Sequence, residues 1–118
     1  MVMIQRSEDI QAWQEARILV KMIYQLTNKE DFSKDYGMRD QIGWAAVSVM
    51  NNIAEGFERQ TNKELTNFLY MAKGSAGEVR SMLGLALELG YLDKEQSQIL
   101  ENLSIEISKI LSGFIKTL

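Results

Sequence analysis

The sequence predicts an all-α protein: an up-down-up-down antiparallel four-helix bundle that assembles as a homo-oligomer. Four long segments repeat apolar residues at three- and four-residue steps, which is the period of an amphipathic helix. None of the 118 residues is proline, so long unbroken helices are permitted and turn-rich β architectures are disfavoured. This length suits one hydrophobic core, and residues 1–118 are expected to form a single four-helix domain.

The first helix is expected over residues 7–26, with Ser7 as its N-cap and Glu8 and Asp9 at the positive end of the helix dipole. Its main apolar face consists of Ile10, Trp13, Ala16, Val20, Ile23 and Tyr24. A second apolar set lies largely on the other side and consists of Ile18, Leu19, Met22 and Leu26. A helix with two apolar sides must bury both or leave one exposed.

A polar connection over residues 27–37 follows, in which Phe32 and Tyr36 are expected to pack back onto the bundle. The second helix is expected over residues 38–60. Its main stripe is Met38, Ile42, Ala45, Ala46, Val49, Ile53 and Gly56, and a second apolar side is Gly43, Val47, Met50, Ala54 and Phe57. Because only a narrow strip of this helix is polar, we predict that it is the most buried element.

The third helix is expected over residues 61–89, with a capping box at Thr61 and Glu64 and a left-handed terminating residue at Gly90. Its core stripe is Leu65, Phe68, Leu69, Ala72, Ala76, Val79, Leu83 and Ala86, and the opposite side carries Gly74, Gly77, Ser81 and Gly84. Three interior glycines together cost about 2–3 kcal/mol relative to alanine. Close approach of another backbone would offset this cost.

The fourth helix is expected over residues 93–118, and Asp93 and Gln96 repeat the capping pattern. Tyr91 and Leu92 form a short turn, so the third and fourth helices must be antiparallel neighbours. The apolar face of the fourth helix is Gln96, Leu100, Leu103, Ile107, Ile110, Leu111, Phe114 and Leu118.

The surplus apolar and small-residue sides favour contact between copies of the chain. In the alternative, long side chains of the same chain cover these residues. The candidate contacts are Ile18, Met22, Leu26, Trp44, Val47, Met50, Phe57, Gly74, Gly77, Ser81 and Gly84. Trp44 is off the core stripe and is the better tryptophan for an interface or ligand contact, whereas Trp13 lies in a core stripe.

The composition restricts the chemistry. With no cysteine and no histidine, the chain lacks thiolate metal ligands and the usual general base, so we expect no enzyme, no cofactor and no metal. The net charge is −3 and no quarter of the sequence is basic, which argues against an extended nucleic-acid face. No apolar run reaches the roughly 18 residues of a membrane span, and the N-terminus has no leader pattern, so we expect a cytoplasmic protein.

A polar seam follows the second and third helices: Gln41, Ser48, Asn52, Glu55, Gly56, Arg59, Ser75 and Glu78. Facing carboxylates of Glu55 and Glu78 could form an acid–base pair or bind a divalent ion. We favour the structural alternative, in which these side chains form hydrogen bonds across helices and set their register. Gly56 has no glycine-rich neighbourhood for a phosphate, so it is expected to permit tight packing or a bend.

Several basic residues could line one end of an oligomer and contact phosphates, although interleaved acids favour an ordinary solvated face. These residues are Arg39, Arg59, Lys63, Lys73 and Arg80, together with Lys21.

Combined motifs resemble a known family. They are Ala12-Trp13-Gln14-Glu15-Ala16, Ala45-Ala46-Val47-Ser48-Val49, Asn52-Ile53-Ala54-Glu55-Gly56, Gly74-Ser75 with Glu78, and Leu89-Gly90-Tyr91. The chain is similar to the four-helix proteins encoded in intervening sequences of 23S rRNA genes (ribosomal S23-type). A relative of that family is the accessory variability determinant of diversity-generating retroelements. The resemblance implies a ring-like homopentamer, which in the retroelement relative binds nucleic acid and the reverse transcriptase.

Two hypotheses follow. The first is a non-catalytic homo-oligomer, pentameric as the resemblance implies, that acts as an interaction scaffold, with itself and another protein as partners. The second is an RNA- or DNA-binding accessory protein. Gly43-Trp44 stands where the family often has basic residues, which argues against the second hypothesis. A carboxylate-dependent enzyme ranks last.

Overall fold

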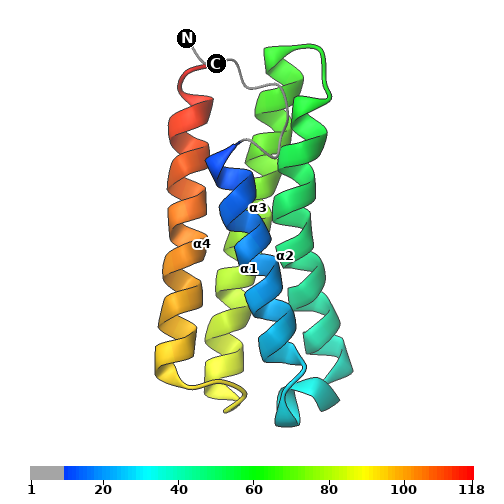
Figure 1. Cartoon of the computed structure of the whole chain (residues 1–118), viewed down its shortest axis with the longest axis vertical. Helices are drawn as coiled ribbons and strands as arrows, with labels where there is room; N and C mark the ends of the chain where they lie inside the picture. The colour runs from blue at the N-terminus through cyan, green and yellow to red at the C-terminus, as the bar shows by residue number, and fades with distance from the viewer. Residues whose placement is uncertain (1–9) are drawn as a thin grey trace.

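A computed structural model describes residues 10–118, which fold into an antiparallel bundle of four long helices (Figure 1). The elements are α1 (Gln11–Thr27), the 3-10 helix η2 (Glu30–Lys34), α2 (Tyr36–Phe57), α3 (Asn62–Glu88) and α4 (Lys94–Ile115). The described part of the chain contains no strand, so the predicted all-α class is confirmed. α2 packs on α1 and α3, and α4 packs on α3 and α1, which places α1 diagonally opposite α3.

The ends of the helices differ from their expected positions. α1 begins at Gln11 with Ile10 as its N-cap, so the expected start at residue 7 is wrong, although Ser7, Glu8 and Asp9 themselves lie outside the described residues. α2 ends at Phe57 rather than at residue 60. The backbone N–H groups of residues 58 and 59 turn back to the carbonyls of residues 55 and 56, which tightens the last turn and leaves a short loop before α3.

The predicted caps place the starts of α3 and α4 correctly. The backbone N–H of Glu64 donates to the Thr61 hydroxyl (3.2 Å), so the N-cap is confirmed, but the reciprocal bond from the Thr61 N–H to the Glu64 side chain of the predicted capping box is not formed. At α4 both halves of the capping box form: the Gln96 N–H donates to Asp93 (2.7 Å), and the Gln96 side chain accepts from the Asp93 N–H (3.0 Å). Gly90 ends the third helix region with φ +79°, the left-handed conformation that glycine adopts without strain.

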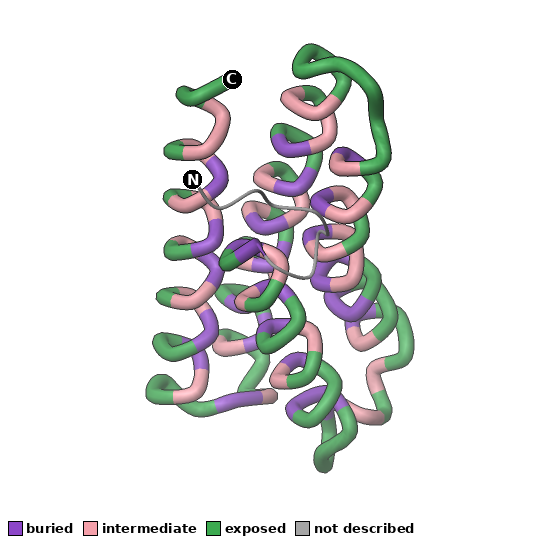
Figure 2. Tube along the Cα trace, turned by 45° about the horizontal axis from the view of Figure 1, so that its top comes forward, coloured by how far each residue is buried: buried purple, intermediate pink, exposed green. Residues whose placement is uncertain are grey.

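One hydrophobic core runs along the inner faces of all four helices, as the buried segments in Figure 2 show. α2 contributes the largest number of buried residues, eight. The main stripe predicted for it is buried throughout and consists of Met38, Ile42, Ala45, Ala46, Val49, Ile53 and Gly56. Periodicity alone therefore identified the face by which α2 packs.

The prediction for α1 was less accurate. Leu19 and Leu26, assigned to a second apolar side, are buried in the core with 0% and 7% of their surface exposed. Tyr24, assigned to the core face, is 49% exposed. The reason is that α1 packs between α2 and α4, so its buried face is centred between the two predicted sets. Leu26 is consequently wrong as a candidate contact between copies.

Two buried serines of α4, Ser97 and Ser104, were not predicted. Ser104 is fully buried, and its hydroxyl donates to the carbonyl of Ala76 on α3 (2.9 Å). A small hydroxyl side chain at this position lets α3 and α4 approach closely while its polar atom remains hydrogen-bonded. The apolar period of α4 gave no sign of this contact, because serine does not register as a core residue.

At one end of the bundle, the two interhelical connections are tied together. The Tyr91 hydroxyl donates to Asp35 Oδ2 (2.8 Å), and the Tyr91 ring stacks on Phe32 with ring centroids 5.0 Å apart. The other carboxylate oxygen of Asp35 accepts from the Met38 N–H (3.1 Å) and caps α2. The hydrogen bond to Asp35, together with burial, raises the pKa of Tyr91. Asp35 thus joins the start of α2 to the turn between α3 and α4.

Substituting Asp35→Ala should lower the free energy of unfolding by about 1–2 kcal/mol, the usual cost of a lost N-cap. It also leaves the Tyr91 hydroxyl without its acceptor. Urea denaturation followed by circular dichroism measures the change. Asp31→Ala is the matched control, since Asp31 is exposed in the 3-10 helix and caps no α-helix. Equal losses in the two variants would contradict the role of Asp35.

The glycines of α2 and α3 lie in different surroundings. A Cβ at Gly56 would lie 3.0 Å from Leu65 Cδ1 and 3.1 Å from Phe68 Cβ, so α2 and α3 approach closely there. This confirms the packing role expected for Gly56. In contrast, no atom lies within 4 Å of a Cβ built at Gly74 or Gly84. Close packing of another backbone was expected to offset the cost of these glycines to helix stability, and at Gly74 and Gly84 no such packing is made within the chain.

Opposite effects on stability are expected at the two kinds of glycine. In a single copy of the chain, Gly74→Ala should raise the free energy of unfolding by about 0.5–1 kcal/mol, because alanine favours the helix and no other part of the chain contacts it there. Gly56→Val should lower it by about 1–3 kcal/mol through overpacking against α3. Thermal unfolding at matched concentrations compares them. A Gly56→Val variant as stable as the wild type would show that α2 and α3 tolerate separation at this end.

Candidate functional site

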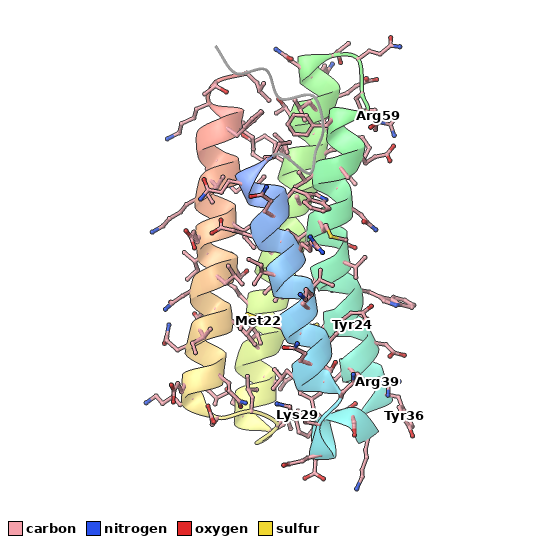
Figure 3. The ribbon with its side chains drawn as sticks, viewed as in Figure 1. Met22, Tyr24, Lys29, Tyr36, Arg39 and Arg59 are labelled. Atoms are coloured by element: carbon pink, nitrogen blue, oxygen red, sulfur yellow. The ribbon has the colours of Figure 1, made fainter. Side chains whose placement is uncertain are left out.

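An exposed aromatic cluster lies where the C-terminal half of α1 meets the N-terminal half of α2. Trp44 is 70% exposed, Tyr36 66% and Tyr24 49%. Tyr24, Tyr36 and Arg39 lie toward the same end of the bundle in Figure 3. We name Tyr24, Tyr36, Arg39 and Trp44 the aromatic face. Its side chains come from two packed helices, so their backbone positions are set by the core beneath them.

The aromatic face surrounds a depression of about 140 Å³, which is lined by Tyr24, Arg39, Trp44 and their neighbours. Its floor includes Gly43, where an added Cβ would lie 3.6 Å from the Tyr24 ring. A larger residue than glycine at this position would fill the depression. The geometry therefore provides a shallow hollow with a projecting indole at its edge.

Arg39 is held in place within the aromatic face. Its guanidinium lies over the Tyr36 ring, 4.8 Å from the centroid. Arg39 Nη1 donates to the Ser33 carbonyl (3.1 Å), and Arg39 Nε contacts Asp40 Oδ1 at 3.3 Å. A cation fixed on an aromatic ring and beside a carboxylate loses little conformational freedom when another surface binds. The cluster is thus suited to protein contact more than to chemistry.

Only part of the aromatic face was predicted from the sequence. Trp44 was placed off the core stripe, in agreement with its exposure, but Tyr36 was expected to pack back onto the bundle and Tyr24 to face the core. Tyr36 is instead the first residue of α2 and projects to solvent, whereas its neighbour in the connection, Phe32, is 1% exposed. The exact start of α2 decides the direction of Tyr36, and periodicity does not locate that start.

The other candidate contacts between copies are distributed over several faces. Ile18 is 49% exposed on α1, and the outer face of α3 exposes Gly74, Ser81 and Gly84. Half-buried members are Met22, Val47, Met50, Phe57 and Gly77. Phe57 makes an edge-to-face contact with Phe114 of α4, with centroids 5.6 Å apart, so part of its surface is already used within the chain. These residues do not form one continuous surface.

The polar seam is mostly not a set of bonds across helices. Gln41 Nε2 donates to Glu78 Oε1 (2.9 Å) and joins α2 to α3. By contrast, Asn52 Nδ2 donates to the Ser48 carbonyl (2.9 Å) within α2. Arg59 and Glu55 likewise pair along one stretch of chain, and Ser75 is half-buried on α3. Much of the seam faces solvent, so its side chains can satisfy one another locally.

Glu55 and Glu78 do not form the carboxylate pair that the sequence allowed. Gln41 contacts Glu78, and Glu55 lies 14 residues farther along α2 than Gln41. At the helical rise this separates the two positions by about 21 Å along the helix axis. Among the described residues, no group of three or more Asp, Glu, His or Cys side chains is placed to hold a metal ion.

The basic candidates are also dispersed. Arg39 belongs to the aromatic face, Lys63 is exposed at the start of α3, and Arg59 lies over the Phe68 ring at 4.7 Å. Only Lys73 and Arg80 share a groove, which α4 completes. The five residues therefore do not line one end of the chain.

Two acidic side chains, Glu15 of α1 and Glu106 of α4, lie close together where these helices pack. One carboxylate oxygen of Glu15 is buried, and Glu106 of α4 is its neighbour. Burial raises the pKa of the Glu15 carboxyl above its ordinary value of 4.5, and the charge of Glu106 raises it further. Bringing two carboxylates together is unfavourable when both are ionised.

Comparison with known proteins agrees with this geometry. A family model for the 23S rRNA-intervening sequence protein matches residues 8–113. The chain belongs to this family. A solved member is a protein of unknown function from the S23 ribosomal protein family of Bacteroides thetaiotaomicron, which is 28% identical with a TM-score of 0.82. The match covers 89% of this chain and 98% of the other. Comparison with curated proteins gives no match.

The family resemblance stated from the motifs is thus confirmed, and the solved member has the same fold. Neither the family description nor that structure assigns a biochemical role. Among the described residues, no helix is both long enough and apolar enough to cross a bilayer.

The Glu15–Glu106 pair predicts a pH-dependent change in stability. Because the folded-state pKa of Glu15 is raised, its favourable contribution is present below pH 4.5 and is lost as pH rises through the folded pKa. Glu15→Gln keeps the neutral form at every pH. It should therefore raise Tm relative to wild type at pH 7, with the difference shrinking toward pH 4.

Thermal unfolding monitored by circular dichroism at both pH values tests this. Glu88→Gln is the control, because Glu88 is exposed at the end of α3 and should shift Tm little at either pH. A Glu15→Gln variant that is less stable than wild type at pH 7 would show that the carboxylate is better satisfied than the geometry indicates.

Proposed function

We propose that the chain is a non-catalytic homo-oligomer that acts as an interaction scaffold, and that its copies associate through the aromatic face. The observation that supports this is the exposure of Trp44, Tyr36 and Tyr24 together at one junction of two helices. Tryptophan, tyrosine and arginine are the residues most enriched at the energetic centres of protein interfaces. All three types are present here around a shallow hollow.

The expected assembly is a pentamer, which rests on the family resemblance. A closed ring requires each copy to present two different surfaces, because a head-to-tail contact is heterologous. The aromatic face would supply one of these surfaces. The outer face of α3 is a candidate for the other, since it exposes Tyr70, Met71 and Leu85 beside the open glycines Gly74 and Gly84. A partner packing there would provide the close approach that these glycines lack within the chain.

The alternative of RNA or DNA binding has less support from the residues first considered for it. Arg39 and Arg59 interact with the acidic side chains of Asp40 and Glu55. Lys63 stands apart from the groove that contains Lys73 and Arg80. A uniform basic surface of the kind that nucleic acids require is not formed by these five positions.

Sedimentation velocity on the full chain tests the scaffold proposal. The wild type should sediment as an oligomer at micromolar concentration. Trp44→Glu should dissociate it, because a charge placed in a desolvated contact is unfavourable. A change to glutamate at exposed Trp44 leaves the core of the chain untouched, and circular dichroism should confirm unchanged helix content.

Ile99→Glu is the matched control, because Ile99 is an exposed apolar residue on α4, outside both proposed contact surfaces. Dissociation of the Ile99→Glu protein but not of the Trp44→Glu protein would move the interface to α4. A wild-type chain that remains monomeric throughout would refute the scaffold.

A further inference from the structure

A second surface of the molecule lies between α3 and α4. A groove of about 540 Å³ is lined by Lys73 and Arg80 from α3 and by Lys109 and Lys116 from α4. The serines Ser108 and Ser112 also line it, and within residues 10–118 no aspartate or glutamate does. The chain as a whole carries a net charge of −3, so the groove concentrates positive charge against the overall balance.

Hydrogen bonds to two serines of α4 hold the Arg80 side chain in this groove. Its Nη1 donates to the hydroxyls of Ser108 (3.2 Å) and Ser104 (3.4 Å). Ser104 is fully buried and is itself anchored by its hydrogen bond to the Ala76 carbonyl. The guanidinium is thus half-buried and oriented by neutral groups, and among the described residues it makes no ion pair with a carboxylate. A half-buried cation of this kind is stabilised by an anion.

The four basic side chains lie at two heights along the helix axes, Arg80 with Lys109 at one and Lys73 with Lys116 at the other, and these heights are called levels here. Since α3 and α4 are antiparallel, moving from Arg80 back to Lys73 on α3 corresponds to moving from Lys109 forward to Lys116 on α4. Each step spans seven residues, or about 10 Å at the helical rise. Gly113, which has no side chain, lines the groove, and a Cβ added at Gly77 would lie 3.5 Å from Arg80 Nη2.

We propose that this groove binds linked phosphate groups. The planar guanidinium of Arg80 can donate two parallel hydrogen bonds to one phosphate, and the lysines supply charge at both levels. The hydroxyl of Ser112, which also lines the groove, is a further donor. A chain of phosphates occurs either in a small oligophosphate or in the backbone of a single nucleic-acid strand. The inference does not rest on the scaffold proposal, because the groove is lined by neither the aromatic face nor the α3 residues offered as the second contact surface.

Isothermal titration calorimetry on the full chain at low ionic strength tests the proposal, with inorganic tripolyphosphate in one arm and a short single-stranded RNA in the other. Binding in at least one arm is expected, and raising the salt concentration should weaken it. Arg80→Gln should weaken it by about tenfold or more, the effect of losing a charge-assisted hydrogen bond. Lys109 is exposed, and Lys109→Gln should lower by about one unit the slope of the logarithm of the binding constant against the logarithm of the salt concentration.

Lys21→Gln is the matched control, because it removes the same charge from the exposed side of α1 and should bind as wild type. Binding of tripolyphosphate alone identifies a small-ligand site, and binding of RNA identifies a strand-binding groove. The proposal is overturned if the wild type binds neither ligand at low salt, or if Lys109→Gln and Lys21→Gln bind equally.

Discussion

The packing of α1 and α3 against α2 determines where the other elements lie. α2 is an apolar helix whose small residues, Ala45 and Ala46, let its neighbours approach, and Gly56 brings the start of α3 against its final turn. Once these two contacts form, α4 is placed by the short turn after α3 and closes the bundle against α1. Each proposed binding surface is therefore a consequence of this packing, because the aromatic face and the basic groove both lie along edges between adjacent helices.

Local chemistry made some features of this structure predictable from sequence. The caps at Thr61 and Asp93 and the left-handed Gly90 depend on neighbours within three or four residues, and all are where they were expected. The buried face of α2 was predicted correctly because its apolar residues recur with a clear helical period. The direction of Tyr24 was not predictable, since a residue at the edge of a broad apolar face can turn either way.

Long-range geometry was beyond sequence reasoning. The sequence allowed Glu55 and Glu78 to face each other because their helices are neighbours, yet contact depends on axial register, and it is Gln41 that lies beside Glu78. Lys109 and Lys116 were not singled out because α4 carries mixed charges along its sequence. Only the alignment of α4 beside Lys73 and Arg80 gathers the positive charges on one side. The two surfaces lie on opposite edges of the bundle, since α1 is diagonal to α3 and α2 to α4.

The hydrogen bond between Tyr91 and Asp35 makes the two ends of the bundle unequal. It clamps both interhelical connections at one end, whereas the opposite end carries the loop between α2 and α3 and the exposed C-terminal residues. Amide hydrogens near the clamp should exchange with solvent only when the whole bundle opens, while those at the other end can exchange through fraying. A gradient of local stability along the long axis is thus built into the fold.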